Sequence, residues 1–456
     1  MAVVRFVRAG LIAASASALA ACATVPSAEE RLPVAPVTAE LAVPDGGEVE
    51  LRYRLAEPTV ALHFAQRTGD YRETAWHPLD PAFRWVAEGD GERLERADGR
   101  VFDNVALSVT PRYRSLVKAY GPFSPFSDGS LLVYSGQFHA CASLPCDGDG
   151  PLPLTIDAPG RAVATPGTRS QSHARFVSEG SGSNVFVGNL APVAADGFNA
   201  IVDPGLPEAM RARLATGLPD AMRRLADAYG PLSTAPDLYV SIDRRAQPDG
   251  NVSIQGGTLP NQIFMHFDGE GIDRKLAGPT DWIDWFFAHE AGHLYQQELA
   301  GSLLGDDRIA WIHEGGADAL AALVFTAEGR DAYVQQRTTE ARDACRQGLE
   351  QRPLTEAAAS AAFDMHYACG MILMLALNRE LRGAGSDLHA FDRSFFGSVR
   401  SGAPWTAEHW FATAGKLGAS DAFIAQARAL VGADNTAALA ALAQLAPQGA
   451  TPEGSD

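Results

Sequence analysis

Positively charged side chains are scarce in this chain. Its 456 residues include 37 Lys and Arg against 55 Asp and Glu, which gives a formal net charge of −18. Removal of the first 21 residues as a leader would take away Arg5 and Arg8, and 35 basic against 55 acidic residues would then give −20. A surface of this sign repels nucleic acid and offers no polybasic patch to an anionic membrane. We therefore expect no nucleic-acid partner.

Cysteine is also scarce, with five in the whole chain. Cys22 follows the leader, and the other four are Cys141, Cys146, Cys345 and Cys369. Their spacings do not form a zinc ribbon. In an oxidising compartment the economical pairing is Cys141 with Cys146 and Cys345 with Cys369. The alternative is that the four are buried free thiols.

Long apolar runs are absent after residue 21, and no later stretch reaches the length of a membrane span. The first 21 residues combine a positive start with an alanine-rich apolar run shorter than a span, which is typical of an export signal. This signal ends in Leu-Ala-Ala-Cys at residues 19–22, which resembles the lipobox of bacterial lipoproteins. The resemblance implies a signal peptide over residues 1–21 and a lipid on Cys22. An ordinary secretory signal with a chance cysteine is the alternative.

The N-terminal and C-terminal segments that flank the expected domains predict an anchored envelope protein with a free C-terminal tail. Ala23 stands where an aspartate commonly retains lipoproteins at the inner membrane. We therefore expect a location in the cell envelope, at the periplasmic face of the outer membrane. Residues 22–47 are rich in Pro, Ala and Val with little periodicity and are interpreted as a tether. Residues 449–456 are expected to be a disordered tail.

The periodicity of the remaining chain predicts an α+β protein in three parts. Residues 48–195 alternate apolar and polar side chains in short runs punctuated by Gly, Pro and Asp, which predicts an antiparallel β domain. Its expected role is to shape one wall of the cleft, and a separate binding module is the alternative. Residues 196–330 are expected to form the catalytic domain, a small sheet with helices, and residues 331–448 a helical domain.

Several individual elements can be placed within these parts. The β domain should contain strands at residues 50–55, 101–109, 131–134 and 185–187. The catalytic domain should contain an amphipathic helix pair at 205–229 and strands at 237–242 and 262–267. Helices are expected at 315–329, 331–350, 356–383, 386–399, 405–416, 419–431 and 435–446.

The strongest chemical signal is the motif His289-Glu290-Ala291-Gly292-His293, which has the pattern H-E-x-x-H. Two histidines four residues apart lie on one face of a helix, so both can bind one metal ion. Zinc accepts imidazole nitrogen in tetrahedral geometry. Glu290 would face a water on that metal and could take its proton. Two stacked, metal-free histidines are the alternative interpretation.

A third ligand is expected twenty residues further on, in the run Trp311-Ile312-His313-Glu314-Gly315-Gly316-Ala317-Asp318. Glu314 can bind the metal. Asp318 lies one helical turn later and can accept the far N–H of a metal-binding histidine. His313 is the rival ligand, and an exposed acidic helix start is the alternative for the pair.

These two motifs together resemble the gluzincin zinc metallopeptidases, the clan of thermolysin and of the alanyl aminopeptidases. A further signal, Tyr367-Ala368-Cys369-Gly370 followed by an apolar helix, resembles the Y-x-K-G of the aminopeptidase branch and of the glycyl aminopeptidases. The resemblance covers about residues 196 to 383. It implies one Zn²⁺ per chain, a peptide or protein substrate, and Tyr367 as hydrogen-bond donor to the oxyanion. Cysteine replaces the usual lysine at 369, and His366 is a second candidate donor.

The segment Gln255-Gly256-Gly257-Thr258-Leu259-Pro260-Asn261 departs from that family. The resemblance implies an edge strand whose glycines, Gly256 and Gly257, let the substrate pair with it. A simple hairpin turn is the alternative. The aminopeptidases have a glutamate here that holds the substrate amine, whereas this chain has Thr258, Leu259 and Asn261. We therefore expect cleavage inside peptides, unless Glu298 or a β-domain acid supplies the carboxylate.

The function expected from the sequence is peptide-bond hydrolysis by a metal-activated water, with Glu290 as general base. Two alternatives stay open. One is an amide hydrolase that acts on a non-peptide component of the cell envelope. The other is a non-enzymatic envelope lipoprotein in which zinc is structural, although a structural site would fill the fourth position with protein. The oligomeric state is not predicted.

Overall fold

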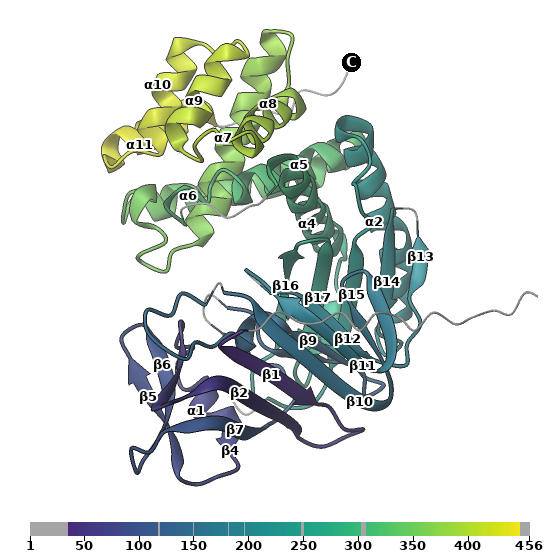
Figure 1. Cartoon of the computed structure of the whole chain (residues 1–456). Helices are drawn as coiled ribbons and strands as arrows, with labels where there is room; N and C mark the ends of the chain where they lie inside the picture. Colours follow the sequence, from purple (N-terminus) through teal and green to yellow (C-terminus); the bar gives the residue numbers. More distant parts are fainter. Residues whose placement is uncertain are drawn as a thin grey trace, which may run out of the picture.

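A computed structural model describes residues 35–116, 119–148, 150–180, 182–195, 197–247, 250–301 and 307–446 (Figure 1). The leader, Cys22, most of the expected tether and the C-terminal tail lie outside the described residues. In Figure 1 the β domain lies below, the catalytic sheet with its helices lies in the middle, and the last helices lie on top. This is the α+β architecture that the sequence predicts. In the described part, no helix is long and apolar enough to cross a membrane.

The β domain is built on a nine-stranded sheet with the order β4-β7-β2-β1-β10-β12-β9-β8, in which β11 pairs with β10. A smaller sheet has the order β3-β6-β5, and the short helix α1 covers Tyr71–Ala75. The strands of this domain are β1 Val37–Ala42, β2 Val49–Thr59, β3 Ala61–Phe64, β4 Trp76–Pro78, β5 Phe83–Glu88, β6 Gly91–Arg96, β7 Phe102–Val109, β8 Phe123–Pro125, β9 Leu131–Tyr134, β10 Leu152–Thr165, β11 Thr168–Ser178 and β12 Asn184–Gly188.

The alternating runs of the sequence form strands as expected. In β2 the apolar side chains of Val49, Leu51, Tyr53 and Leu55 are buried and the residues between them are not, which is the two-residue period of a half-buried strand. The other three predicted strands correspond to β7, β9 and β12. One pair departs from the antiparallel prediction, because β1 runs parallel to β10. These two strands are far apart in sequence, so no hairpin fixes their direction.

The tether prediction is wrong for its last residues. Val37–Ala42 forms β1, whose Val37, Ala39 and Leu41 are buried in the β-domain core. The alternation is present there, but it covers three apolar positions in a Pro- and Ala-rich segment. The folded β domain therefore begins before the expected boundary at residue 48.

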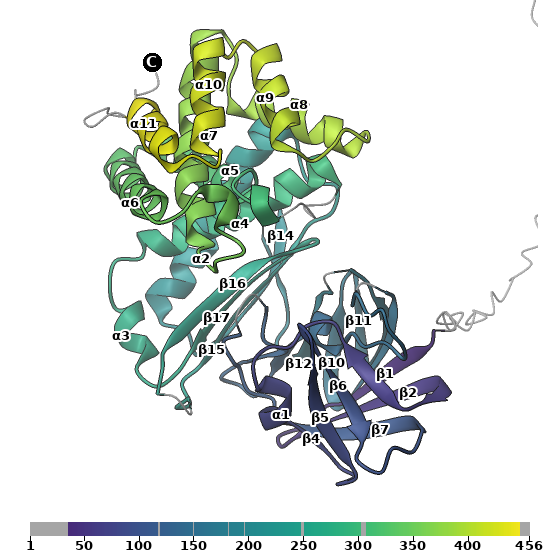
Figure 2. The ribbon, with the colours of Figure 1, turned by 90° about the vertical axis from the view of Figure 1, so that its left-hand side faces the viewer.

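The catalytic sheet has five strands in the order β13-β14-β15-β17-β16, namely β13 Val193–Ala195, β14 Phe198–Val202, β15 Asp237–Asp243, β17 Gln262–Asp268 and β16 Ser253–Leu259. Its two faces bury different partners. Ile263, Met265 and Phe267 of β17 pack with the helices, whereas Phe264 packs with the β domain. Figure 2 shows β16 at the edge of this sheet, between the helices above it and the β domain below.

The helix pair expected at 205–229 is one helix, α2, over Glu208–Tyr229. Pro219 lies inside it, where a proline removes one backbone donor and crowds the carbonyl four residues before it. The buried series Met210, Leu214, Leu218 and Leu225 continues through the proline without a change of face. Packing of this stripe against α4 therefore outweighs the proline as a break signal.

The other helices are α3 Ile272–Leu276, α4 Asp281–Ala300, α5 Glu314–Ala327, α6 Asp331–Leu349, α7 Asp364–Gly383, α8 Leu388–Arg400, α9 Ala407–Lys416, α10 Asp421–Leu430 and α11 Asn435–Leu445. All seven helices predicted after Gly316 exist. The main difference is at 356, where the expected helix start is a short 3₁₀ turn and α7 begins at Asp364. Ala361, with φ of 55°, interrupts the helix there.

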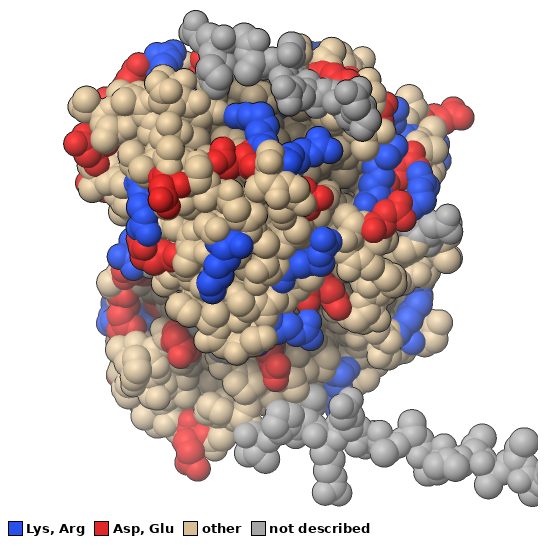
Figure 3. Space-filling model, turned by 90° about the horizontal axis from the view of Figure 1, so that it is seen from above, with Lys and Arg blue, Asp and Glu red and all other residues tan. Residues whose placement is uncertain are grey.

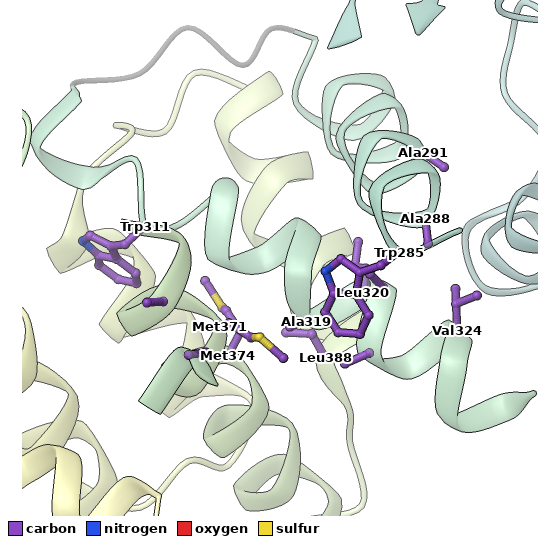
Figure 4. Packing of buried hydrophobic residues seen from close by; sticks show 14 of the residues in the cluster. Trp285, Ala288, Ala291, Trp311, Ala319, Leu320, Val324, Met371, Met374 and Leu388 are labelled. Carbon is purple, nitrogen blue, oxygen red and sulfur yellow. The ribbon is translucent and has the colours of Figure 1, made fainter. Parts of the chain in front are cut away.

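The expected boundary at residue 330 does not separate two cores. One hydrophobic cluster runs from Phe198 of the sheet to Leu445 of α11. Figure 4 shows Trp285 and Ala288 of α4, Ala319 and Leu320 of α5, and Met371 and Met374 of α7 in that cluster. The reason is that α5 is apolar around most of its surface, so it needs neighbours on several sides.

Charges are mixed on the outer face of the last helices. In Figure 3 the Lys and Arg side chains and the Asp and Glu side chains are interspersed over that face. Among these helices, Arg428 of α10 pairs with Glu408 of α9. The described part of this face therefore shows no extended area of one sign.

A buried carboxyl joins the catalytic part to the last helices. Asp392 of α8 accepts a hydrogen bond from the Tyr229 hydroxyl at 2.6 Å, and His389 contacts the same hydroxyl at 2.9 Å. Burial raises the pKa of Asp392 to about 7, opposed by the Tyr229 bond and Arg393, while Asp387 adds to the rise. The protonated carboxyl therefore stabilises the fold fully below its ordinary pKa near 4. That stability is lost as the pH rises through 7.

Asp392→Asn should therefore stabilise the protein above pH 7, because asparagine keeps the acceptor for Tyr229 and removes the charge. We expect its thermal midpoint to exceed that of the wild type by a few degrees at pH 8 and to match it near pH 4. Asp343→Asn, at a half-buried position of α6, is the control and should change neither value. Equal midpoints for the wild type and Asp392→Asn at pH 8 would contradict this prediction.

Candidate metal centre and active site

Helix α4 presents both histidines of the H-E-x-x-H motif to one point. His289 and His293 lie one turn apart on the same face, and their ring centroids are 4.6 Å apart. Both are buried, with 6% and 7% of their surface exposed. The helix is held on its other faces by α2, α5 and the sheet, through Ile283, Trp285 and Phe287.

Glu314, the first residue of α5, completes the set. Its Oε2 lies 3.1 Å from Nε2 of His293 and 3.4 Å from Nε2 of His289. One ligand atom from each of the three residues lies within 4.8 Å of the others. Two imidazole nitrogens and one carboxylate oxygen are the donor set of a catalytic zinc site with an open fourth position. The residues present therefore fit zinc, and in the described residues no further His, Cys, Asp or Glu joins this group.

Glycines bring α4, α5 and α7 close enough to form this site. A Cβ on Gly315 would lie 2.2 Å from the Gly370 backbone of α7, and a Cβ on Gly292 would lie 3.3 Å from Ala317 of α5. Larger side chains at these points would push the helices apart. The glycines that follow Glu314 and Cys369 in the two motifs are thus required by packing.

Both histidines are oriented by partners on their far nitrogens. Oδ1 of Asp318 lies 3.0 Å from Nδ1 of His289 and also accepts from Nε1 of Trp285 at 2.9 Å. Oε1 of Gln296 lies 3.0 Å from Nδ1 of His293. A hydrogen on each Nδ1 leaves each Nε2 free for a metal. The sequence predicts the contact of Asp318 but not that of Gln296, although Gln296 lies three residues after His293 on the same helix.

Asp318→Ala should weaken zinc affinity by about 10- to 100-fold, because His289 loses the acceptor that fixes its ring. Asp318→Asn is the matched control, since its side-chain oxygen can still accept from His289 and Trp285, and its loss should be smaller. Competition with a chromophoric chelator gives both dissociation constants. Unchanged zinc affinity in Asp318→Ala would show that this carboxylate does not support the site.

The structure also places the two rival residues. His313 precedes α5, and its Nε2 lies 3.4 Å from Oε1 of Glu314. The two motif histidines contact the other carboxylate oxygen, Oε2. It is not part of the three-ligand group. His366 is completely buried and packs its ring 5.0 Å from that of Phe363.

Glu290 lies beside the ligands and is held by a residue of the edge strand. The hydroxyl of Thr258 lies 2.8 Å from Oε2 of Glu290 and 3.0 Å from its backbone carbonyl. Burial raises the pKa of Glu290, and the charges of His289 and His293 and the bond from Thr258 oppose that rise. The contact of Thr258 with Glu290 is not apparent from the sequence.

Tyr367 of α7 reaches the same centre. Its ring stacks on that of His289, with centroids 5.6 Å apart. Burial raises its pKa, and the negative charges of Glu314 and Glu290 raise it further. The hydroxyl therefore keeps its proton and can act as a hydrogen-bond donor at the metal centre.

Gly256 and Gly257 lie on the edge strand β16, as the resemblance implies, and not in a turn. A Cβ on Gly256 would meet the ring of Phe286 on the helix side at 2.3 Å. A Cβ on Gly257 would meet the hydroxyl of Tyr120 on the β-domain side at 2.2 Å. Glycine at both positions therefore lets other side chains cover the two faces of the strand.

The β domain contributes Tyr120 to the wall of the site. Its ring packs against Phe264 at 4.8 Å and against Tyr134 at 5.5 Å. Burial raises its pKa, and the nearby charges of Glu290 and Glu314 add to the rise. A cavity of about 700 Å³ lies on the β-domain side, and Tyr120, Gln255 and Phe363 are among the residues that line it. Sequence reasoning missed Tyr120, because only the fold brings this loop to the edge strand.

Both disulfides that the sequence predicts are present, with Cα atoms 5.6 Å apart for Cys141–Cys146 and 4.9 Å apart for Cys345–Cys369. The second joins α6 to α7 two residues after Tyr367. Glu298, the acid considered as an alternative amine ligand, accepts from Ser233 at 2.9 Å. It lies eight residues after Glu290 on α4, about 12 Å along the helix.

Comparison with known proteins gives a likeness in structure. No protein-family model matches the sequence, and no curated protein matches it. An aminopeptidase N family protein from Idiomarina loihiensis aligns over 85% of this chain and 72% of its own, with a TM-score of 0.55 and 13% identity. An M1 zinc metallopeptidase from Deinococcus radiodurans aligns over 85% of this chain and 90% of its own, with a TM-score of 0.45 and 16% identity.

At 13% identity the first of these structures shows the fold. The β domain, the mixed catalytic part and the helical C-terminal part of this chain follow that multi-domain architecture. The resemblance to the gluzincins that the motifs suggest is thus confirmed at the level of fold. The activity has to be argued from the site itself.

Proposed function

We propose that this protein is a zinc-dependent peptidase of the gluzincin type. The observation that carries the proposal is the convergence of His289, His293 and Glu314, with Glu290 beside them and Tyr367 stacked on His289. A metal site with three protein ligands, a neighbouring base and a hydroxyl donor is equipped for hydrolysis of an acyl bond. The structural neighbours are named as an aminopeptidase N family protein and a zinc metallopeptidase, and these names support a peptide as the substrate.

Zinc held by these three residues would lower the pKa of a water molecule to about 7 and polarise the scissile carbonyl. Glu290 takes the proton of the attacking water and passes it to the leaving amine. Thr258 fixes the orientation of the Glu290 carboxylate while it does so. Tyr367 donates a hydrogen bond to the oxyanion, an interaction typically worth about 10²–10³ in rate.

The experiment that tests the proposal is hydrolysis of a mixed peptide library by the purified mature chain. Activity should disappear after treatment with a chelator and return when zinc is added back. An inactive, zinc-loaded protein would overturn the peptidase proposal and favour a non-peptide amide or a structural metal.

We expect cleavage inside peptides in preference to removal of single N-terminal residues. Thr258 and Leu259 supply no carboxylate at the amino end of the cleft, and Leu259 is 4% exposed. A charged amine buried there would be costly, whereas an extended chain can pair along β16. An N-acetylated peptide should therefore be cleaved at least as fast as the same peptide with a free amine. Resistance of the acetylated peptide, with stepwise trimming of the free one, would identify an aminopeptidase.

The position in the cell is a further part of the proposal. Cys22 carries a lipid and holds the chain at the periplasmic face of the outer membrane. Radiolabelled fatty acid should enter the wild type and not Cys22→Ser, and membrane association of an unlabelled Cys22→Ser variant would refute the lipid anchor.

A further inference from the structure

Arg161 is buried without a counter-ion. Two arginines of the described part are almost fully buried, Arg72 at 4% and Arg161 at 7% exposure. Arg72 pairs with Glu92 at 2.6 Å. The guanidinium of Arg161 instead donates to the backbone carbonyls of Val43 and Pro44, and its Nε has no acceptor.

This arrangement is unusual for a protein with a net charge of −18. An unpaired charge taken out of water is costly, and buried arginines are normally paired. Among the described residues no carboxylate lies within ion-pair distance of Arg161. Asp45, on the exposed loop after β1, acts on it only at longer range: burial lowers the pKa of Arg161, and the charge of Asp45 opposes that change.

Arg161 lines a cavity of about 550 Å³ at the seam between the β domain and the catalytic sheet. Three segments meet there: the loop after β1, the tip of the β8–β9 hairpin and the C-terminal end of β15. This volume is that of a pocket for a small organic molecule and exceeds what a simple ion needs. Much of the wall is apolar and is formed by Val49, Pro125, Phe126, Leu131 and Ile242.

Among the described charged side chains that line the cavity, Arg161 is the one without an ion-pair partner. Arg245 also lines it but pairs with Asp243 at 2.6 Å. Arg244 lines it as well and pairs with Asp273 at 2.7 Å. A ligand with a single negative charge would therefore balance the site, whereas a dianion would exceed it.

The cavity is separate from the metal centre. Thr258, which contacts Glu290, is in register with Ile263 and through it with Leu238 of β15. Ile242 lies four residues further along β15, about 13 Å along the strand. A ligand at Arg161 would thus touch both the β domain and the catalytic sheet without contacting the proposed zinc ligands.

We propose that this cavity binds a small organic monocarboxylate with an apolar body. The carboxylate accepts hydrogen bonds from the guanidinium of Arg161 and neutralises its charge, and the hydrocarbon part packs against the apolar wall. A charge-assisted bond of this kind supplies both affinity and selection for the anion. The site bridges two parts of the fold, so its occupation stabilises the whole chain.

The test uses the purified mature chain with hexanoate as probe, in calorimetry and thermal unfolding. Hexanoate should bind saturably and raise the midpoint of unfolding, and neutral hexanamide should bind at least about tenfold more weakly. Arg161→Met should weaken hexanoate binding by a similar factor, and Arg161→Lys should retain more of it than Arg161→Met. Arg175→Met, on the exposed side of β11, is the control and should bind as the wild type does.

Three results would overturn the proposal: no saturable binding of hexanoate, equal binding of hexanamide, or unchanged binding by Arg161→Met. Tighter binding of hexyl phosphate than of hexanoate would overturn the monocarboxylate as the ligand class. The comparison of hexanoate with hexanamide is made on the wild type, so it decides the matter even if an Arg161 variant does not fold. None of these readouts depends on peptide hydrolysis, so the proposed enzymatic function is tested separately.

Discussion

Replacing Glu290 by glutamine should remove nearly all peptide hydrolysis and leave zinc binding intact. Glutamine keeps the size of the side chain and an oxygen that can accept from Thr258, but it cannot take a proton from water. A positioned general base typically contributes about 10²–10⁴ in rate, so kcat should fall by at least that range. Zinc content should stay at about one per chain, because Glu290 is not among the three residues that converge on the metal position.

Glu298→Gln is the matched control for this variant. Glu298 lies on the same helix, two turns beyond Glu290, and contacts Ser233. Its kcat should equal that of the wild type. A Glu290→Gln enzyme with full activity would reject the proposed mechanism, whatever its metal content.

Replacing His293 by alanine should remove both zinc and activity. Two ligands would remain, and the Glu314 carboxylate would lose the nitrogen that lies 3.1 Å from its Oε2. Zinc bound after dialysis, measured by atomic emission, should fall from about one per chain to a small fraction of that value. The variant should still fold, because most of the core lies outside the metal site.

His313→Ala separates this prediction from its rival. His313 is close to Glu314 but outside the three-ligand group, so its alanine variant should keep zinc. If His293→Ala retained full zinc and His313→Ala lost it, the ligand assignment would be wrong.

The convergence of the three candidate metal ligands could be predicted because its geometry follows local rules. The four-residue spacing of His289 and His293 fixes their common face in any helix, and Asp318 follows Glu314 by the same spacing. The prediction of Glu314 as third ligand also needed the spacing of the resembled family, because the sequence alone left His313 as a rival ligand. The structure then distinguished the two, because only Glu314 Oε2 faces both histidines.

The residues that the sequence did not reveal are those brought in by tertiary contacts. Tyr120 comes from a β-domain loop, and its place over Gly257 depends on how that domain docks on the sheet. Thr258 gave no signal of its own, since a threonine in a strand is ordinary. Its contact with Glu290 exists because β16 runs beside α4.

The errors in the fold have similar causes. β1 was missed because three alternating apolar residues are a weak signal in a Pro- and Ala-rich segment, and the partner that fixes it, β10, is over a hundred residues away. The helix pair expected at 205–229 is a single helix, because burial of one continuous stripe carries α2 through Pro219. Local sequence signals determine the secondary structure only where tertiary packing does not oppose them.

Titration of zinc into the chelator-stripped mature chain tests the proposed zinc peptidase most directly. Bound metal and the rate of cleavage of an N-acetylated peptide would be followed in the same samples. We predict that the stripped chain is inactive and that both signals rise together and saturate at about one zinc per chain. Full hydrolysis by the stripped chain, or saturation with zinc without any hydrolysis, would contradict this account.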